Sequence, residues 1–249
     1  MRRSVVGQVS KRSVNANMLE GIIFDMDGVL INSHPVHRDA WRKFLSTVGK
    51  DIADDDLDFI LEGRRREEIL RHFFGELPEE IVAEYGHRKD QLFQANFDSV
   101  QVVPGVRTFL ERLKAAGMPA SIATSASSGR TRATLRSLKL ENVFVAVVTG
   151  DDVQAGKPDP AVYRLASEQM NLPPEELLAL EDAPCGVRAA RSAGIRCIGV
   201  ATNGHTDALL QAGADRVIPN FLGLTVEKML DIWNEIHSHD TRSPSHSSA

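Results

Sequence analysis

Short apolar runs alternate with segments of helical spacing along the second half of the chain. Strands are predicted at Ala120 to Ala123, Val143 to Val148 and Leu177 to Leu180, with helices over residues 130–139 and 160–170 between them. Strands that alternate with helices are typical of a mostly parallel sheet covered by helices on both faces. We therefore predict a Rossmann-like α/β fold.

The same pattern extends in both directions along the chain. A β-type run at Gly21 to Phe24 ends at Asp25, and Gly28 would let the chain turn sharply after it. Two further short strands are predicted at Ile195 to Val200 and Arg216 to Ile218. The remaining helices are expected before Gly117, before Gly194 and around the apolar positions Val226, Met229, Leu230 and Trp233.

Residues 34–100 break this alternation. Trp41, Phe44 and Leu45, and later Ile69 with Leu70, follow helical spacing, and no clear strand lies between them. We interpret residues 34–100 as a helical cap. It is inserted into an α/β core that consists of residues 20–33 and 101–236.

The two ends of the chain have a different composition. Residues 1–19 contain no Asp or Glu but carry basic residues at positions 2, 3, 11 and 12. A disordered extension is the favoured interpretation, with an organelle transit peptide as the alternative. Residues 237–249 are polar and rich in Ser and His, which predicts a disordered tail.

Composition narrows the classes of partner and setting. A formal net charge of -5 gives no electrostatic reason to expect a nucleic-acid partner. No apolar run approaches the length of a membrane span, so no membrane partner is expected either. The two cysteines, Cys185 and Cys197, are too few for a disulfide framework. A reducing, cytoplasmic setting fits best, and a monomer is favoured.

Polar residues follow several of the predicted strands. These residues are Asp25 with Asp27, Thr124 with Ser125, Lys157, and Glu181 with Asp182. Ligands of open parallel sheets bind in the crevice outside the carboxyl ends of the strands, where these residues are expected to lie. Each group alone also fits a turn, a helix cap or a solvated charge. Their joint occurrence in this order favours a common site.

Four motifs carry a resemblance to a known family. They are Asp25-Met26-Asp27-Gly28-Val29-Leu30, Ala123-Thr124-Ser125, Gly156-Lys157-Pro158-Asp159-Pro160 and Glu181-Asp182-Ala183-Pro184-Cys185-Gly186. Together they closely resemble the motif series of the haloacid dehalogenase-like hydrolase superfamily, over roughly residues 20–220. The position of the insertion is similar to the helical cap of the branch that contains β-phosphoglucomutase, phosphoglycolate phosphatases and sugar-phosphate phosphatases.

The resemblance implies a phosphoryl-transfer mechanism. Asp25 would be the nucleophile and form an aspartyl-phosphate, while Asp27 would act as general acid and base. A phosphoryl group repels a carboxylate, so a metal ion is needed to neutralise charge. Mg²⁺ prefers oxygen ligands, which suits Asp25, the Asp27 carbonyl and Asp182, with Glu181 in support.

The remaining motifs would bind the phosphate and the rest of the substrate. The resemblance assigns phosphate contacts to Ser125, with Thr124 beside it, and to Lys157, which would also restrain Asp25. In the stretch Leu61 to Glu67, Arg66 matches a substrate-binding arginine, with a solvated turn as the alternative. His37 matches a histidine of the first cap helix that would position Asp27 or substrate; a surface histidine is equally compatible.

Two departures from the mutase pattern bear on function. Glu62 stands where β-phosphoglucomutase has a lysine, which would weaken retention of a sugar bisphosphate. Asn32 stands near the expected cap hinge, where relatives commonly have Asp. We therefore expect a Mg²⁺-dependent phosphatase of a small phosphate monoester, either a sugar or polyol phosphate or a phosphoglycolate-like compound. A phosphomutase and a non-catalytic binding protein are the alternatives, and Asp27 disfavours a carbon-halogen hydrolase.

Overall fold

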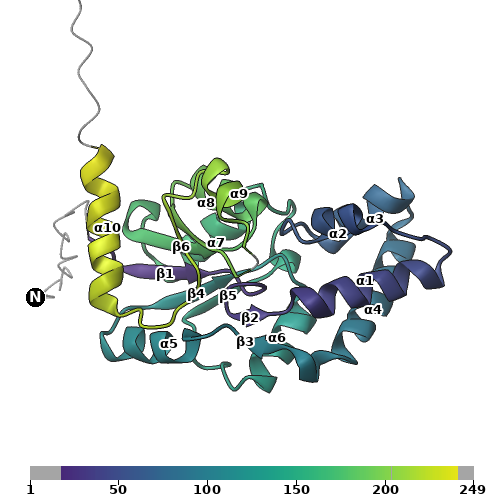
Figure 1. The fold of residues 1–249 in the computed structure, drawn as a ribbon, viewed down its shortest axis with the longest axis horizontal. Coiled ribbons are helices and arrows are strands. Elements are labelled where there is room, and N and C mark those ends of the chain that lie inside the picture. The colour runs from purple at the N-terminus through teal and green to yellow at the C-terminus, as the bar shows by residue number, and fades with distance from the viewer. Residues whose placement is uncertain (1–17, 203, 241–249) are drawn as a thin grey trace, which may run out of the picture.

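A six-stranded sheet forms the centre of the computed structural model, which describes residues 18–202 and 204–240 (Figure 1). The strand order is β5-β4-β1-β6-β7-β8, and every pairing within this sheet is parallel. The strands are β1 (Gly21–Phe24), β4 (Ala120–Ala123), β5 (Ala146–Val148), β6 (Leu177–Glu181), β7 (Arg196–Val200) and β8 (Arg216–Ile218). The predicted α/β fold class is confirmed.

Helices cover both faces of this sheet. The helices of the core are α5 (Val106–Ala115), α6 (Ser128–Ser137), α7 (Ala161–Met170), α8 (Pro184–Ser192), α9 (Thr206–Gln211) and α10 (Val226–Asp240). Residues of α5, α6 and α10 share one hydrophobic cluster with Ile22 and Phe24, whereas α7, α8 and α9 pack with Ile23 in another. Side chains of β1 therefore alternate between two buried faces, which explains why this strand is apolar throughout.

Some element boundaries differ from the predictions. Residues 143–145 are not part of β5, whose pairing begins at Ser121↔Ala146, and the side chain of Val145 is 61% exposed. The helix predicted at 130–139 begins at Ser128, because Ser127 accepts a hydrogen bond from the Arg130 amide as its N-cap. Near the C-terminus, α10 continues to Asp240, so residues 237–240 are helical rather than part of a disordered tail.

The predictions for the two chain ends fall only partly within the described residues. Met18 and Leu19 precede β1, and Leu19 is buried against the core. The rest of the predicted N-terminal extension, and residues 241–249 of the predicted tail, lie outside the part of the chain that the structure describes.

Four α-helices lie between the short strands β2 (Ile31–Asn32) and β3 (Gln101–Val102), which pair antiparallel. They are α1 (His34–Thr47), α2 (Asp54–Ile60), α3 (Arg66–Phe74) and α4 (Glu79–Gln94). This segment, residues 34–100, is called the helical insert below. It has a hydrophobic cluster of its own, which includes Trp41 and Phe44. The short 3-10 turns η1 (Phe97–Ser99), η2 (Gly150–Asp152) and η3 (Pro174–Glu176) complete the described elements.

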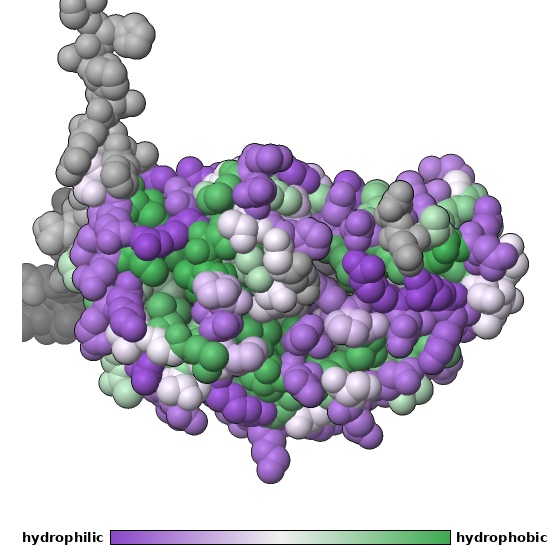
Figure 2. Space-filling model, viewed as in Figure 1, coloured by the Kyte–Doolittle hydropathy of each residue, from purple (hydrophilic) through white to green (hydrophobic). Residues whose placement is uncertain are grey.

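The helical insert lies at the opposite end of the molecule from α10 (Figure 1). Hydrophilic residues cover most of the insert on the face shown in Figure 2, and the larger apolar areas of that face lie over the core. Val36 and Phe93, near the ends of α1 and α4 that adjoin the core, belong to the core cluster. Among the described residues, no helix is both long and apolar enough to span a bilayer.

Candidate active site

The central position of β1 brings three of the predicted motifs to one edge of the sheet. β1 pairs with β4 on one side and with β6 on the other, all in parallel. The residues that follow these three strands therefore lie side by side, as expected for the carboxyl ends of parallel strands. They are Asp25, Thr124 with Ser125, and Asp182, and Glu181 lies beside them as the last residue of β6.

Lys157 reaches this edge from the loop after β5. Its Nζ donates to Asp25 Oδ1 at 2.6 Å, to Glu181 Oε1 at 2.5 Å and to the Ala123 carbonyl at 3.0 Å. Burial would lower the pKa of the Lys157 ammonium, but the charges of Asp25 and Glu181 outweigh it and raise the pKa above its usual value. Lys157 is therefore a permanent cation that fixes the position of the Asp25 carboxylate.

The acids of the site carry more negative charge than Lys157 balances. Carboxylate oxygens of Asp25, Glu181 and Asp182 lie within 4.8 Å of one another, and all three residues are buried. Burial raises the pKa of the Asp25 carboxyl well above its usual value; Lys157 opposes this shift, and Glu181 and Asp182 add to it. Burying such an excess of like charge is unfavourable without a further cation. The donor set therefore fits a divalent metal ion that prefers oxygen ligands.

Asp182 has a carboxylate oxygen with no assigned hydrogen bond among the described residues. This oxygen, Oδ2, is buried, and Nε2 of His34, 3.1 Å away, would pair with it when that nitrogen carries a proton. Gly28 approaches it closely, because a Cβ at position 28 would meet Asp182 Oδ2 at 1.9 Å. The glycine of the first motif thus leaves room for this carboxylate.

Glu181 has a different environment. Its Oε1 accepts hydrogen bonds from Lys157 and from the Tyr163 hydroxyl at 2.6 Å, and its Oε2 accepts from the Asp182 amide at 3.2 Å. Burial raises the pKa of this carboxyl, and Lys157 opposes the shift. These contacts suit a residue that holds Lys157 and the loop after β6 in place.

The Asp27 side chain lies outside the acid cluster. Its two oxygens accept from the Arg130 guanidinium at 2.9 and 2.5 Å, and Oδ1 also accepts from the Ser33 hydroxyl at 2.6 Å. Burial would raise the pKa of the Asp27 carboxyl, but Arg130 and His37 hold it well below its usual range. In this arrangement Asp27 is ionised. The metal role predicted for Asp27 rests on its backbone carbonyl and stays a prediction.

His37 connects Asp27 with a buried lysine of the helical insert. Its Nε2 lies 3.2 Å from Asp27 Oδ1, and its Nδ1 lies 3.1 Å from Nζ of Lys89, a residue of α4 that is 3% exposed. Burial, reinforced by Lys89, lowers the pKa of His37 to about 3. A neutral ring that accepts from Lys89 at Nδ1 carries its proton on Nε2 and donates it to Asp27. The equally weighed alternative of a surface histidine is wrong, because His37 is 8% exposed.

The hydroxyls of the second motif make contacts within the protein. Ser125 donates to the carbonyl of Gly63, in the loop of the helical insert, at 2.7 Å. Thr124 is 1% exposed and accepts from the Ala126 amide at 3.2 Å. Both residues line a cavity between the core and the helical insert, so the choice between them as the phosphate-binding hydroxyl stays a prediction.

Arg66 also lines this cavity, within a group of ion pairs. It donates to Asp90 at 2.8 Å and to Glu67 at 3.0 Å, and Arg64 is paired with Glu62 at 2.8 Å. The arginine-rich loop is therefore matched by acids of the same insert. Its predicted role in substrate binding stays a prediction.

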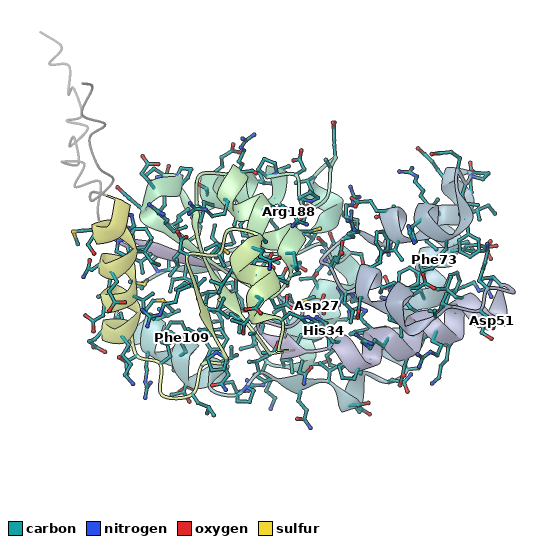
Figure 3. The ribbon with its side chains drawn as sticks, turned by 45° about the horizontal axis from the view of Figure 1, so that its top comes forward. Asp27, His34, Asp51, Phe73, Phe109 and Arg188 are labelled. Atoms are coloured by element: carbon teal, nitrogen blue, oxygen red, sulfur yellow. The ribbon has the colours of Figure 1, made fainter. Side chains whose placement is uncertain are left out.

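The cavity that contains Asp25, called the main cavity here, lies where the core meets the helical insert, and a second, larger cavity of about 510 Å³ adjoins it at His34, Leu61 and Asp182. Figure 3 shows Asp27 and His34 at this junction, far from Asp51 and Phe73 at the distant end of the insert. Its walls include Asp25, Asp182 and Ser125 from the core, with Arg66 and Lys89 from the insert. Its volume is about 80 Å³, well below the roughly 300 Å³ at the lower end of small-molecule pockets. The insert therefore closes over the acids in this structure.

Several residues of the site carried no signal that singled them out in the sequence. Arg130, Lys89 and His34 lie on helices, where a charged or polar residue is most often solvated. Tyr163 has helical spacing typical of a core position, and only its bond to Glu181 reveals its place in the site. In α1, His34 and His37 lie on the same side of the helix as the buried Ala40 and Trp41. This helical spacing is the sequence feature that indicates burial of the two histidines.

The fold and this arrangement of acids define the class of protein. A model of the haloacid dehalogenase-like hydrolase family matches residues 22–200, so the chain belongs to this family. The family inferred from the four motifs is confirmed.

Individual relatives agree with this assignment. A phosphorylated carbohydrates phosphatase of Thermotoga maritima is 32% identical over 232 residues, which cover 88% of this chain and 100% of the relative. A β-phosphoglucomutase of Bacillus subtilis is 30% identical over 227 residues, covering 87% and 96%. The crystal structure of CbbY from Rhodobacter sphaeroides in complex with phosphate aligns with a TM-score of 0.75 at 30% identity, over 86% of this chain and 100% of that chain.

Proposed function

We propose that this protein is a Mg²⁺-dependent phosphatase that hydrolyses a small phosphate monoester through a phosphorylated Asp25. The chain is an enzyme of the class that hydrolyses phosphoric monoesters, as its family and its phosphatase relatives indicate. The observation that carries the finer proposal is the meeting of Asp25, Glu181, Asp182 and Lys157 at the carboxyl end of the central strands.

The first half of the reaction would form the phosphorylated enzyme. An oxygen of Asp25, held by Lys157, attacks phosphorus, and the bond from phosphorus to the ester oxygen breaks. Asp27 gives a proton to the departing oxygen. A divalent cation held by Asp25, Asp182 and the Asp27 carbonyl would neutralise charge on the phosphoryl oxygens. Ser125 or Thr124 would donate hydrogen bonds to those oxygens.

The second half would restore the enzyme. Water attacks phosphorus, the bond from phosphorus to Asp25 breaks, and the water's proton passes to Asp27. Because Asp27 is ionised and bound by Arg130 in the observed arrangement, this pair has to separate and Asp27 has to take up a proton from solvent before the first proton transfer.

The substrate we propose is a phosphorylated sugar or polyol, or a phosphoglycolate-like compound. The phosphorylated carbohydrates phosphatase supports the carbohydrate class. The cavity of about 80 Å³ requires the helical insert to open before such a substrate enters. We place the hinges at residues 31–34 and 100–104, where β2 and β3 connect the insert with the core.

A substrate screen tests the proposal. Inorganic phosphate release is measured over a panel of phosphorylated sugars, polyols and glycolate, with Mg²⁺ and with a chelator in excess. We expect Mg²⁺-dependent release from at least one sugar or polyol phosphate or from phosphoglycolate. A generic aryl phosphate is assayed beside the panel. If neither it nor any member of the panel releases phosphate, a non-catalytic binding protein on this fold is favoured.

A phosphomutase is the second candidate, since one relative is a β-phosphoglucomutase. Glu62 argues against it, because it stands where that enzyme type has a lysine and here pairs with Arg64 at 2.8 Å. Incubation with a hexose 1-phosphate and a trace of bisphosphate separates the two. Rearranged sugar phosphate would support the mutase, and free phosphate supports the hydrolase.

A further inference from the structure

Arg130 occupies an unusual position for a cation of this site. It lies near the start of α6, on the core, and 8% of its side-chain surface is exposed. Its Nη1 and Nη2 donate to the two oxygens of Asp27 at 2.9 and 2.5 Å, and its guanidinium carbon lies 5.1 Å from the centre of the Phe93 ring. Arg130 also lines the main cavity. A buried arginine in this place faces whatever the cavity binds.

The pairing partner of Arg130 sets it apart from Arg64 and Arg66, two other cations of the cavity. Arg64 is paired with Glu62, and Arg66 with Asp90 and Glu67. Those acids have no expected part in the reaction. Arg130 instead holds the carboxylate that is expected to carry protons. A guanidinium that binds both oxygens of a carboxylate stabilises its anionic form and fixes its direction.

Releasing Asp27 requires another anion for Arg130. A buried guanidinium left without a partner would be strongly unfavourable. Asp90, whose charge also acts on Arg130, already accepts from Arg66 and Ser127 and lies 3.5 Å from Nζ of Lys89. A hydroxyl of a neutral substrate cannot balance the charge. The replacement anion would therefore come from the substrate.

We infer that Arg130 is a substrate-binding residue that accepts a second anionic group of the substrate, a carboxylate or a phosphate, in exchange for Asp27. The substrate would then carry two anionic groups, one transferred to Asp25 and one bound by Arg130. Its arrival frees Asp27 to turn toward the departing oxygen, so that only a substrate with both groups completes the catalytic arrangement. This inference rests on the proposed phosphatase function. It is compatible with Glu62, because a hydrolase does not need to retain its substrate between turnovers.

Matched substrates test this role. Glycerol 1-phosphate and 3-phosphoglycerate differ by a hydroxymethyl group in place of a carboxylate, and fructose 1-phosphate and fructose 1,6-bisphosphate differ by a second phosphate. For wild type we expect a higher kcat/KM for the anionic member of at least one pair, and that pair identifies the group. In Arg130→Gln the ratio of kcat/KM values within that pair falls by about tenfold or more, because a charge-assisted bidentate contact is lost.

Two controls separate this role from a purely structural one. Arg132→Gln, on the exposed side of the same helix, should keep the wild-type ratio. Arg130→Lys, which retains charge without the bidentate fork, should give an intermediate ratio. Binding of both members of the pair is also measured by calorimetry in Asp25→Asn, which does not turn them over. Adding Arg130→Gln to this variant should abolish the preference for the anionic ligand. Thermal melting checks that each variant is folded.

An unchanged ratio in Arg130→Gln, whatever the absolute loss of activity, would overturn the inference and leave Arg130 as a positioning residue for Asp27. A wild-type enzyme that prefers the neutral member of both pairs would overturn it as well. Neither outcome contradicts the proposed function, which fails only if no phosphate is released in the presence of Mg²⁺.

Discussion

At the scale of single residues, Gly28 combines two requirements. Its φ of +78° is readily adopted by glycine, and a Cβ there would collide with Asp182. The turn after β1 therefore needs glycine both for its backbone and for the space beside a proposed metal ligand. This is a residue whose importance the motif indicated and whose physical reason only the structure provides.

Gly28→Ala should weaken metal binding more than folding. Displacing the Asp182 carboxylate should raise the Mg²⁺ concentration required for half-maximal activity by about tenfold or more, as for other residues that orient metal ligands. Gly49→Ala is the matched control, because Gly49 has a similar φ of +74° with no atom within 4 Å of a built Cβ. Mg²⁺ titrations of activity and of thermal melting make the measurement. An equal Mg²⁺ requirement in both variants would show that Gly28 serves the backbone alone.

The buried charge of Lys89 should lower the free energy of unfolding of the protein. Burial, with the nearby Arg130, lowers the pKa of Lys89 to about 8. At pH values below about 8 the folded protein must bury this charge, so Lys89→Met should be more stable at pH 7 by about 1–3 kcal/mol, and less active. Above pH 8 the folded lysine loses its proton before the unfolded one does, so wild type gains stability and the difference shrinks by pH 10. Urea unfolding at pH 7 and pH 9.5 measures this, and a difference that grows with pH would contradict it.

The residues of the acid cluster were predictable because each follows a short apolar strand, so that topology alone brings them together. Asp25, Glu181 and Asp182 are of this kind. Arg130 and Lys89 were not predictable, because a single charged residue on a helix does not reveal which tertiary contact buries it. Their partners, Asp27 and His37, lie 103 and 52 positions away along the chain.

At the scale of elements, the loop before α3 joins the helical insert to the core. Arg65 donates to the Val153 and Gln154 carbonyls at 3.3 and 3.0 Å, and Ser125 donates to the Gly63 carbonyl at 2.7 Å. These contacts connect segments more than 60 positions apart and hold the insert over the cavity. Ser125 therefore has two uses, one in closure and one in the phosphate binding that we propose.

Arg65→Ala should shift the insert toward an open arrangement. The variant loses two hydrogen bonds to core carbonyls. Each such bond from a charged donor contributes about 1–2 kcal/mol at most, because water can replace it. We therefore expect KM to rise by about three- to tenfold, with a smaller effect on kcat. Arg71→Ala, an exposed position on α3, is the control and should leave KM unchanged. Steady-state kinetics with the best substrate of the screen decide the matter. An equal KM in the two variants would remove the closing role of Arg65.

The elements that were predicted well are those with long or strongly apolar patterns. The β1, β4 and β6 strands belong to this group, and so does the apolar stripe of α10, whose end lies beyond the predicted one. The two-residue strands β2 and β3 were missed, because a pairing as short as Ile31↔Val102 and Asn32↔Gln101 leaves no periodic pattern in the sequence. Their antiparallel pairing nevertheless fixes the spacing of the two connections to the insert.

At the scale of the whole molecule, the hydrophobic cluster of the helical insert and the core cluster that includes Ile22 and Phe24 are connected mainly through α1, α4 and the β2–β3 pair. A movement about these connections would expose the acids without unfolding either cluster. Hydrogen exchange in residues 31–34 and 100–104 should therefore slow when Mg²⁺ and a phosphate mimic are added together. Exchange rates in these segments that do not respond to the two ligands would contradict closure of the insert.

The central claim is that acids from separate strands hold a divalent cation and leave Asp25 free to bond phosphorus. The most direct test is acid quenching of a reaction in its first turnover, followed by peptide mass spectrometry. We predict a Mg²⁺-dependent mass increase of one phosphoryl group on the peptide that contains Asp25, absent in folded Asp25→Asn, which should also lose at least about 10³-fold in kcat. Phosphate release by Asp25→Asn at the wild-type rate, or a phosphoryl group found on another residue, would contradict this account.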